Sequence, residues 1–596
     1  MLWKMKQRQV AWLAEEKGTI HKDWGGRLCI ALAFPNRYQV GMSNLGFQSV
    51  YEDLNLFEDI VCERVFYPEP EDLDLLRQNP GNLISVESQR AVHDFHLLAF
   101  SIAYENDYCN VLEMLSLAGI PPLAERRTSM HPLVAAGGVA VFLNPEPLAS
   151  FIDFFFIGEA EALLPDFWEC WQHFKNESSR RRELLKSLAR EIPGIYVPSL
   201  YRVSYKPDGA IDFTEPIPAS GIPERVVYRR ADLLRAHPCR TLITTPNTEF
   251  SNVVLVEIGR GCGRGCRFCA AGFVYRPVRF HPADAVLQVE EESGRKALRM
   301  GLVSAAVSDH PEISSICETL SKRGALISFS SLRADNIPPS IIASLQSSGH
   351  QAVAIAPEAG SERLRRVINK NITETQIYEA AKVITEGGIL HLKLYFMIGL
   401  PTETQDDLEA IVEMTKGVKH HVLKSSRGKK RLGTITLSVN SFVPKAFTPF
   451  QWVPFAGVAL LKERARWIQR GLHKISNVRV HFDLPKWAYV QALLARGDRR
   501  VGMFLEKVAL EGRTWQQAFR DVPVNPDFWV LRERGQEEVF PWEIIDNGIN
   551  RTFLWDEYQR ALHGEMSSPC RPGEKCIRCG VCERSTGCCS SEETTL

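Results

Sequence analysis

The middle of the chain alternates short apolar runs with stretches of helical periodicity. The apolar runs have the length of buried strands and lie at 253–259, 301–309, 325–333, 351–358, 390–399 and 434–444. The stretches between them carry helix signals, such as the Thr373 start and the Gly387-Gly388 stop of residues 373–388. Strands that alternate with helices form parallel sheets, and six such units make a partial or complete α/β barrel. We therefore expect chemistry at the carboxyl ends of these strands.

The first third of the chain shows the same alternation. Strand candidates lie at 27–36, at 96–105, inside 132–148 and at the start of 151–171. They predict a second, Rossmann-like parallel sheet, whose ligands would bind at the carboxyl ends of the strands. The residues expected at that edge are Tyr38, Ser43, Asn44, Gly137, Gly138, Asn144, Gly158 and Glu159. Turn chemistry alone explains the same residues, so a ligand site and ordinary turns both stay open.

The charge balance and the termini narrow the class of protein. Lys plus Arg and Asp plus Glu both number 71 in 596 residues, which argues against a dominant basic surface and leaves nucleic acid open as a partner without indicating it. No apolar run approaches the ~18 residues that cross a membrane, and the charged start lacks the apolar core of a signal peptide. We expect a cytoplasmic protein with reduced cysteines and no membrane partner.

Three cysteines, Cys262, Cys266 and Cys269, follow the first barrel strand directly. A structural zinc site needs four ligands, and the nearest fourth is His281. A redox disulfide leaves one thiol unexplained. An iron–sulphur cluster held by three thiolates keeps one iron open for a ligand. Glycines would let the backbone wrap such a cluster, and the nearby Arg260, Arg264 and Arg267 would offset its negative charge.

This stretch, "GRGCGRGCRFCAAGF", resembles the Cys-x3-Cys-x2-Cys signature of the radical S-adenosylmethionine (SAM) superfamily, including the aromatic Phe268 before the last cysteine. The resemblance implies that Cys262, Cys266 and Cys269 are catalytic and hold a 4Fe-4S cluster. It implies that the open iron chelates SAM and that a 5′-deoxyadenosyl radical removes a hydrogen atom from an unknown substrate. It also implies a reductant such as flavodoxin or ferredoxin as a partner.

Further segments match other parts of that superfamily less tightly. At the end of one strand, ribose hydroxyls or the carboxylate of SAM would suit Ser330, Arg333 and Asp335. The resemblance implies that the SAM site also includes Glu358, Ser361 and Arg363 after the next strand. The stretch "YFMIGLPTET" resembles an adenine contact, with Met397 and Ile398 offering backbone and apolar surface. Phe396 or a near neighbour stands where that motif has its first glycine, which is a departure from the pattern.

The first domain resembles the cobalamin-binding type that precedes many radical SAM barrels. The similarity implies cofactor contacts at Ser43, Asn44, Gly137, Gly138, Gly158 and Glu159. The Asp-x-His-x-x-Gly loop that gives cobalt a histidine ligand is missing, because residues 34–47 contain no histidine. We expect cobalamin to bind without a histidine ligand or not to bind at all.

The second cysteine cluster lies at the end of the chain. Cys570, Cys576, Cys579 and Cys582 are followed by Cys588 and Cys589, and few large apolar residues lie among them. A short segment without a core often folds around a metal, and either zinc or a second iron–sulphur cluster fits four thiolates. The close Cys-x2-Cys-x2-Cys spacing favours the cluster, and a plain flexible tail is the remaining alternative.

These observations give one prediction for the whole chain. It has an α/β fold with a cobalamin-binding-like Rossmann domain over 1–230, a partial (β/α)6 radical SAM barrel over 245–480 and a mostly helical region with a cysteine-rich tail over 481–596. The favoured reaction is cobalamin-linked methyl transfer to an unactivated carbon. The alternatives are a radical oxidoreductase or methylthiotransferase-like RNA-modifying enzyme without cobalamin, and a non-catalytic iron–sulphur or zinc scaffold.

Overall fold

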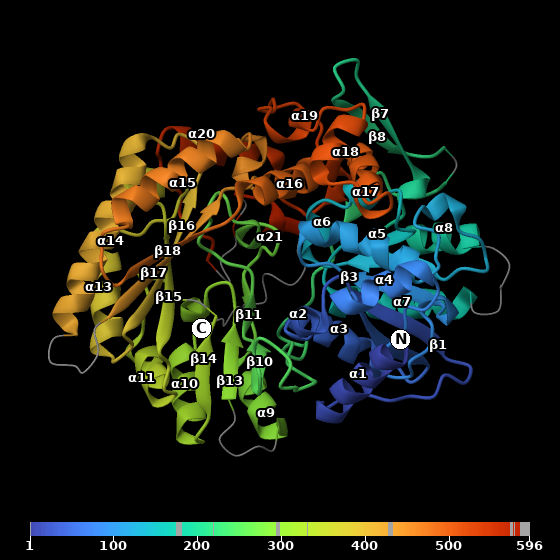
Figure 1. Cartoon of the computed structure of the whole chain (residues 1–596), viewed down its shortest axis with the longest axis horizontal. Coiled ribbons are helices and arrows are strands. Elements are labelled where there is room, and N and C mark those ends of the chain that lie inside the picture. Colours follow the sequence, from blue (N-terminus) through green and yellow to red (C-terminus); the bar gives the residue numbers. More distant parts are fainter. Residues whose placement is uncertain are drawn as a thin grey trace, which may run out of the picture.

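The computed structural model describes residues 2–174, 181–218, 220–293, 299–330, 332–426, 433–571, 576 and 578–584. Two α/β bodies lie side by side, and the C-terminal helices lie across both (Figure 1). The predicted fold class is confirmed: a Rossmann-like parallel sheet, a partial barrel and a mostly helical last region follow one another along the chain. No helix in the described part of the chain is both long and apolar enough to cross a membrane.

The N-terminal sheet has six strands in the order β2-β1-β3-β4-β5-β6, all parallel except that β6 runs antiparallel to β5. The strands are β1 (Leu28–Phe34), β2 (Ile60–Phe66), β3 (Leu97–Ser101), β4 (Leu133–Gly137), β5 (Phe154–Phe156) and β6 (Ile195–Tyr196). The helices of this region are α1 (Leu2–Glu15), α2 (Tyr38–Met42), α3 (Leu45–Leu56), α4 (Pro70–Gln78), α5 (Tyr108–Leu117), α6 (Val139–Leu143), α7 (Ala160–Phe174) and α8 (Arg181–Glu191). Helices α3 and α7 contact each other, as do α4 and α5.

Strand β2 is the one long strand of this sheet that the sequence pattern did not predict. It contains Glu63 and Arg64, which break the apolar run expected of a buried strand. Arg64 is fully buried because it forms ion pairs with Glu16 at 2.7 Å and Glu87 at 2.6 Å. The charge is therefore tolerated through partners that are distant in sequence and leave no local signal.

The barrel consists of a three-stranded and a four-stranded parallel sheet, joined by a parallel bridge between Leu332 and Ile355. Its strands are β10 (Val253–Glu257), β13 (Arg299–Val303), β14 (Leu326–Phe329), β15 (Ala352–Glu358), β16 (His391–Ile398), β17 (Thr434–Ser441) and β18 (Val478–Phe482). Its helices are α9 (Ala283–Ser293), α10 (Ile313–Lys322), α11 (Pro339–Ser347), α12 (Glu362–Val367), α13 (Glu374–Glu386), α14 (Gln405–Ser425) and α15 (Val458–Leu472). The six predicted strands match β10 and β13 to β17. The seventh, β18, was missed because it alternates with exposed Arg479 and His481.

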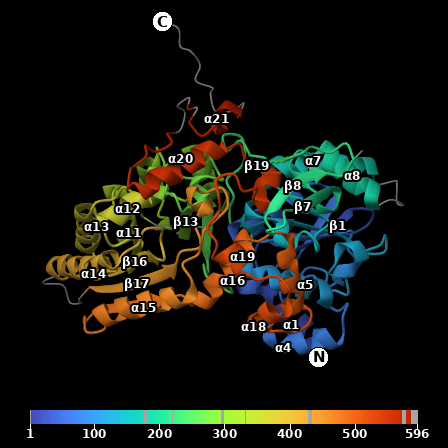
Figure 2. The same ribbon diagram turned by 90° about the horizontal axis from the view of Figure 1, so that it is seen from above.

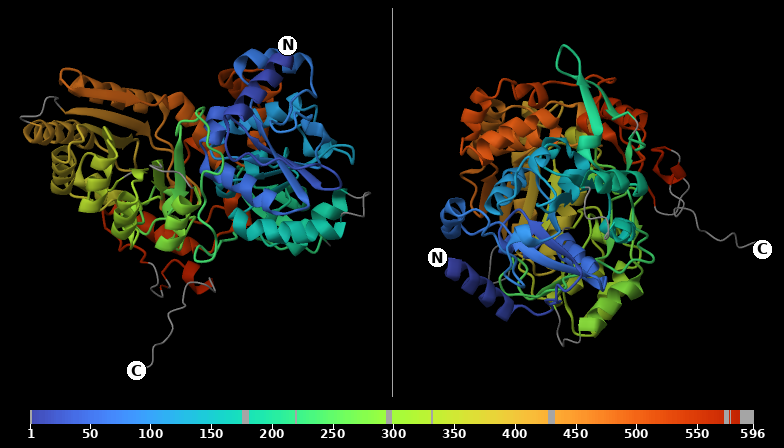
Figure 3. Two further views of the ribbon diagram at one scale, coloured as in Figure 1. Left: turned by 90° about the horizontal axis from the view of Figure 1, so that it is seen from below. Right: turned by 90° about the vertical axis from the view of Figure 1, so that its right-hand side faces the viewer.

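Short strands connect these bodies: β7 (Tyr201–Tyr205) and β8 (Ile211–Pro216) form a hairpin, β9 (Val226–Val227) pairs with β19 (Ile545–Asp546), and β11 (Gly259–Arg260) pairs with β12 (Arg279–Phe280). The last region contains α16 (Pro485–Arg496), α17 (Gly502–Ala509), α18 (Trp515–Asp521), α19 (Asp527–Val530), α20 (Arg551–Leu562) and α21 (Val581–Arg584). Helix α17 packs on α5 of the N-terminal body and α20 packs on α12 of the barrel. Seen from above and from below, this region spans the two bodies (Figure 2 and the left view of Figure 3).

The basic turn at 496–500 belongs to this contact, and its arginines bind other parts of the chain. The Arg499 guanidinium lies 2.9 Å from the Glu146 carboxylate of the N-terminal body, and Arg500 lies 2.6 Å from Asp498. Arg496 is buried and donates to main-chain carbonyls, including that of Trp529 at 2.8 Å. These arginines hold the C-terminal region in place.

Candidate functional site

The loop of residues 259–273, called here the cluster loop, begins where β10 ends. Its glycines are needed for its path: Gly261 has φ +85° and Gly265 has φ +71°, and a Cβ on Gly261 would lie 2.7 Å from the Tyr275 carbonyl oxygen. The Cys269 N–H donates to the Cys266 carbonyl at 3.0 Å, which folds the two cysteines into one turn. The loop thus gathers the thiols of Cys262, Cys266 and Cys269 at the mouth of the barrel.

Electrostatics show that these three thiols lie close enough to sense one another. Burial raises the pKa of the Cys269 thiol to about 12, and Cys266 and Cys262 push it in the same direction. Burial also raises the pKa of Cys262, again with a contribution from Cys266. A metal must therefore displace the protons for thiolates to form here, and cationic iron does so when it binds.

The spacing of the sulphur atoms suits a cluster better than a single zinc ion. Among the described residues, three potential ligand atoms lie within 4.8 Å of one another only at Glu161, Cys239 and Glu257. Thiolates on one tetrahedral zinc ion lie about 2.3 Å from the metal and so ~3.8 Å apart. His281, the fourth zinc ligand that the sequence offered, has its Nε2 3.7 Å from a Glu257 oxygen instead. In the described residues, the three cysteines and His281 therefore do not form a ready zinc site.

The positive charges that act on the cysteines differ from those expected. The Arg333 charge lowers the pKa of Cys262, and the Lys370 charge lowers that of Cys269, although burial outweighs both effects. The prediction that Arg260 and Arg267 serve this purpose was wrong. Arg260 binds carboxylates of the N-terminal body, and buried Arg267 binds Glu557 at 3.2 Å. Lys370 was missed because no motif surrounds it.

Arg264, the third expected arginine, does act on the cluster loop, because its charge interacts with Cys262. Its guanidinium lies 2.5 Å from Asp309 and 3.3 Å from Asp335. Asp335 also accepts a hydrogen bond of 2.9 Å from Arg333, so the predicted pair Arg333 and Asp335 is engaged beside the cluster loop. This network fixes the Arg333 charge next to the cysteines.

Glu358 occupies a strained position at the end of β15. Its φ is +67°, and the register of β15 shifts between Ile355 and Glu358. A non-glycine residue in this region costs on the order of 1–3 kcal/mol and persists where the fold enforces it, often at functional sites. Burial raises the pKa of its carboxyl group, while the Lys370 ammonium, 3.3 Å away, opposes that shift. Glu358 and Lys370 thus form a largely buried pair, and the Lys370 charge acts on Cys269.

The other residues predicted for the SAM site have clear local roles. Ser361 caps α12, since its Oγ accepts from the Leu364 N–H at 3.0 Å. Arg363 pairs with Asp407 on α14 and donates to the Thr402 carbonyl at 2.8 Å. Ser330 donates to the Ser304 carbonyl at 3.2 Å. Those contacts leave Ser361 and Arg363 explained by the fold alone.

The apolar candidates of the barrel differ in exposure. Ile398 is buried, whereas Phe268 and Met397 are partly buried against the core. On β16, Met397 alternates with buried Phe396 and Ile398, so it lies on the strand face opposite to theirs. Met397 and Phe268 are therefore available to a ligand, and Ile398 offers its backbone only.

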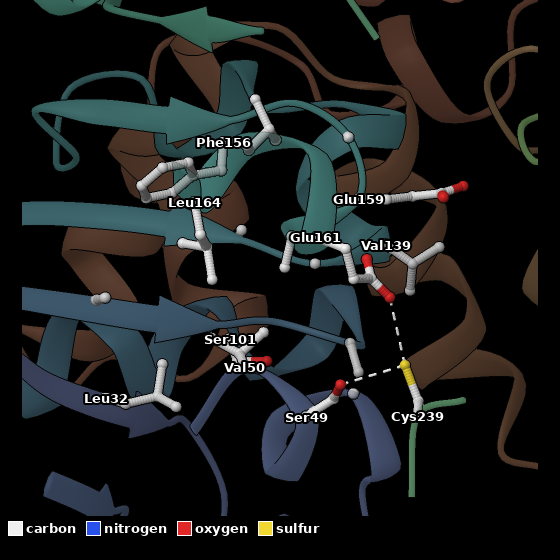
Figure 4. Close-up of a pocket in the computed structure, with 18 of the residues that line it drawn as sticks. Leu32, Ser49, Val50, Ser101, Val139, Phe156, Glu159, Glu161, Leu164 and Cys239 are labelled. Atoms are coloured by element: carbon white, nitrogen blue, oxygen red, sulfur yellow. Dashed lines mark hydrogen bonds between the residues drawn. The ribbon is translucent and has the colours of Figure 1, made fainter. Parts of the chain in front are cut away.

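A cavity of about 370 Å³ lies between the N-terminal sheet, helices α3 and α7, and the first barrel strand. One end is apolar, with Leu32, Val50, Phe156 and Leu164, and the other end carries Glu159, Glu161 and Cys239 (Figure 4). The predicted edge residues that line it are Asn44, Gly137, Gly138, Gly158 and Glu159. Ser43 does not line it and instead donates to the Gln39 carbonyl at 2.6 Å.

The polar end of this cavity is the contact between the two bodies. Arg260, from the cluster loop, lies 2.8 Å from Glu159, 2.8 Å from Glu161 and 2.7 Å from Glu257. Burial raises the pKa of Glu257, but the nearby Arg260 and His281 charges outweigh it and hold the pKa at about 2. The cavity therefore ends in an ion-pair network that includes the cluster loop itself.

Cys239, which belongs to neither cysteine cluster of the sequence, lies in the same network and makes polar contacts. Its Sγ is 3.4 Å from Glu161 and accepts from Ser49 at 3.2 Å and from Arg260 at 3.4 Å. Burial raises the pKa of this thiol, and Glu257 and Glu161 raise it further. These partners lie far away in sequence, so the sequence offered no local signal. No histidine lines the cavity in the described part of the chain.

The C-terminal cysteines Cys570, Cys576, Cys579 and Cys582 lie within the described residues, and Cys588 and Cys589 lie outside them. The Cys570 N–H donates to the Gly263 carbonyl of the cluster loop at 2.6 Å. The two cysteine groups, some 300 residues apart in sequence, thus meet at this contact.

Comparison with known families agrees with this geometry. The family model for radical SAM proteins, N-terminal, matches residues 46–198, and the model for the radical SAM superfamily matches residues 256–415. An uncharacterized protein of Methanocaldococcus jannaschii is 28% identical over 484 residues, 80% of this chain and 90% of that protein. An uncharacterized methyltransferase of Pyrococcus horikoshii is 25% identical over 243 residues, 39% of this chain and 50% of that protein.

Among solved structures, the chain resembles the radical SAM methyltransferase TsrM of Kitasatospora setae, whose structure holds cobalamin and a 4Fe-4S cluster, with 12% identity and a TM-score of 0.47 over 73% of this chain and 75% of that one. It also resembles the cobalamin-dependent SAM radical enzyme OxsB, with 14% identity and a TM-score of 0.41 over 65% of this chain and 52% of that one.

Proposed function

We propose that this chain, which belongs to the radical SAM superfamily and is an enzyme, couples SAM cleavage at the cluster loop to a cobalamin held in the N-terminal cavity and transfers a methyl group to an unactivated carbon. The single observation that carries this proposal is that a residue of the cluster loop forms part of the cavity wall. Arg260 belongs to the cluster loop and also lines the cavity. The two cofactor positions are therefore neighbours.

The residues at the cluster loop suit a 4Fe-4S cluster and SAM. Three thiols on a glycine-rich loop provide the protein ligands for three irons. The Arg333 and Lys370 charges offset the charge of the thiolates, and the buried Glu358 offers a carboxylate to a cationic ligand. When bound, the cluster and SAM supply an electron and a radical precursor, while the chain positions them and excludes water.

The cavity suits part of a cobalamin molecule. Its apolar end matches the aromatic base of the nucleotide tail, and Gly137, Gly138 and Gly158 at the strand ends leave room for the rest. Bound cobalamin supplies a methyl carrier between SAM and the carbon substrate. Because no histidine lines the described cavity, we propose binding without a histidine ligand to cobalt.

The remaining expectations also belong to this proposal. We propose a flavodoxin or ferredoxin as the reductant and the cytoplasm as the location, because the cluster chemistry needs a one-electron donor and reduced thiols. We also propose that Cys570, Cys576, Cys579 and Cys582 bind a second metal centre.

The test fills the cavity. Val50→Trp, on α3, places an indole in the cavity, and Val10→Trp, at an exposed position of α1, is the matched control. After anaerobic reconstitution with iron, sulphide and hydroxocobalamin, we expect the control to retain cobalamin and Val50→Trp to lose at least about tenfold in cobalamin affinity. Both variants should keep the iron of the cluster loop.

Two results would contradict the proposal. A wild-type protein that cleaves SAM but never retains cobalamin would favour the radical oxidoreductase or methylthiotransferase-like enzyme without cobalamin. Equal cobalamin binding by Val50→Trp and Val10→Trp would remove the cavity from the cofactor site.

A further inference from the structure

We propose that Cys570, Cys576, Cys579 and Cys582 hold an iron–sulphur cluster that passes electrons from a protein donor to the cluster loop. The inference rests on the proposed function only in that a cluster at Cys262, Cys266 and Cys269 receives the electron. The tail centre would be the entry point for electrons from a protein donor.

The first argument is the contact between the two cysteine groups. The Cys570 N–H donates to the carbonyl of Gly263, the residue after Cys262, over only 2.6 Å. A Cβ on Gly263 would collide with the Cys570 carbonyl oxygen, so the loop needs glycine at this point for the tail to approach. One hydrogen bond therefore separates a ligand residue of the tail from the neighbour of a ligand residue of the loop.

The second argument is that the segment before Cys570 is anchored to the same loop. Buried Arg267 donates to the Glu565 carbonyl at 2.8 Å and to Ser567 at 3.1 Å. The Ser567 N–H donates to Asn369 at 3.0 Å, and Asn369 donates in turn to the Gly265 carbonyl at 3.1 Å. Burial of the Arg267 guanidinium costs free energy unless it is bound in this way. The contact between the tail segment and the cluster loop is therefore part of the fold.

The third argument concerns the other end of the tail segment. The Asn550 N–H donates to the Cys579 carbonyl at 2.8 Å, directly before α20. Cys579 is buried, and Gly580 has φ +85° beside the Asn550 side chain. Arg578 donates to the Ser568 carbonyl at 3.2 Å. Both ends of the cysteine segment are thus fixed to α20 and the cluster loop.

The kind of metal follows from spacing and chemistry. The Cys-x2-Cys-x2-Cys run is typical of iron–sulphur proteins. Zinc carries no electrons, so a zinc site here could take no part in reducing the cluster loop.

The electron step balances. A reduced flavodoxin or ferredoxin gives one electron to the tail cluster, and the donor is oxidised. The tail cluster returns to its oxidised state as the cluster at Cys262, Cys266 and Cys269 gains that electron. The same electron then enters the carbon–sulphur bond of SAM as this bond breaks, and no proton or further reactant is needed.

The experiment compares two reductants on one variant. Cys576→Ser removes a tail ligand, and Cys109→Ser, half-buried in α5 and away from both groups, is the matched control. We expect about eight irons per reconstituted wild-type or control chain and about four in Cys576→Ser, with one cluster signal missing in electron paramagnetic resonance. With dithionite, a small reductant that reaches the loop directly, SAM cleavage by Cys576→Ser should stay within about twofold of the control. With reduced flavodoxin it should fall at least about tenfold.

Three outcomes overturn the inference. An unchanged iron content in Cys576→Ser, or zinc in place of iron in the tail, would show that the tail holds no iron–sulphur cluster. Equal losses of SAM cleavage with dithionite and with flavodoxin would show that the tail cluster does not pass electrons to the cluster loop. Cys582→Ser, altered at the far end of the segment, repeats the test and guards against a local folding defect. Wild-type protein that binds eight irons yet cleaves no SAM with dithionite would contradict the proposed function and leave the tail cluster standing.

Discussion

The cluster loop and the N-terminal cavity meet at Arg260 but are built in opposite ways. The loop offers thiols and arginines and lies beside the charged Glu358–Lys370 pair, whereas most of the cavity wall is apolar. A ligand on the loop depends on single atoms at defined positions, whereas a ligand in the cavity depends on shape and buried area. A single substitution at the loop should therefore abolish ligand binding, whereas a single substitution in the cavity should weaken it gradually.

The largest expected effect is at a cluster ligand. Cys266→Ala leaves two thiolates on the loop, so the cluster should be lost and SAM cleavage should fall below detection, while Cys109→Ala should behave as wild type. Iron content and formation of 5′-deoxyadenosine measure the result. Full turnover by Cys266→Ala would contradict the contrast between loop and cavity, because ligand binding at the loop would then not depend on single atoms.

The next effect is at the buried pair. Lys370→Met leaves the Glu358 carboxylate without its partner in a buried site, and we expect SAM cleavage to fall about 10- to 100-fold with iron content retained. Lys382→Met, exposed on α13, is the control. SAM affinity by equilibrium dialysis separates a binding defect from a chemical one. Wild-type affinity and turnover would show that the pair serves folding alone.

A third substitution addresses the residue common to both regions. Arg260→Met leaves Glu159, Glu161 and Glu257 without their central cation, and breaking a buried ion pair costs about 3–5 kcal/mol. The free energy of unfolding in urea should fall by that order, against a small change for Arg240→Met, which is about a third exposed. A small loss of unfolding free energy in both variants would mean that Arg279, 2.6 Å from Glu159, neutralises the carboxylates well enough without Arg260.

The smallest effect is in the pH dependence of stability. Burial raises the pKa of Asp53, on α3, to about 7, and Glu161 and Glu52 raise it in the same direction. The folded chain holds this proton up to about pH 7, whereas the unfolded chain releases it near pH ~4. The stabilisation is therefore complete below pH ~4 and is lost as pH rises through 7. Asp53→Asn should narrow the difference in melting temperature between pH 5 and pH 8, and an unchanged difference would contradict the shift.

Local sequence patterns predicted what depends on neighbours in the chain. The barrel strands and the gathering of Cys262, Cys266 and Cys269 follow from apolar runs and short spacing. Strand β2 was missed because Arg64 is neutralised by Glu16 and Glu87, and Cys239 because its partners come from another body. Lys370 carries no motif. Each miss involves a charge or thiol whose environment is set by residues that only folding brings near.

The contact of Cys570 with Gly263 also sets an order of assembly. Chains emerge from the ribosome from the N-terminus, so the cluster loop appears about 300 residues before the segment that docks on it. A newly made chain therefore passes through a stage in which the barrel can fold and receive iron while that side of the loop is still uncovered. Cofactor delivery has its widest access then, and a chain that ends prematurely before Cys570 stays in that stage for good.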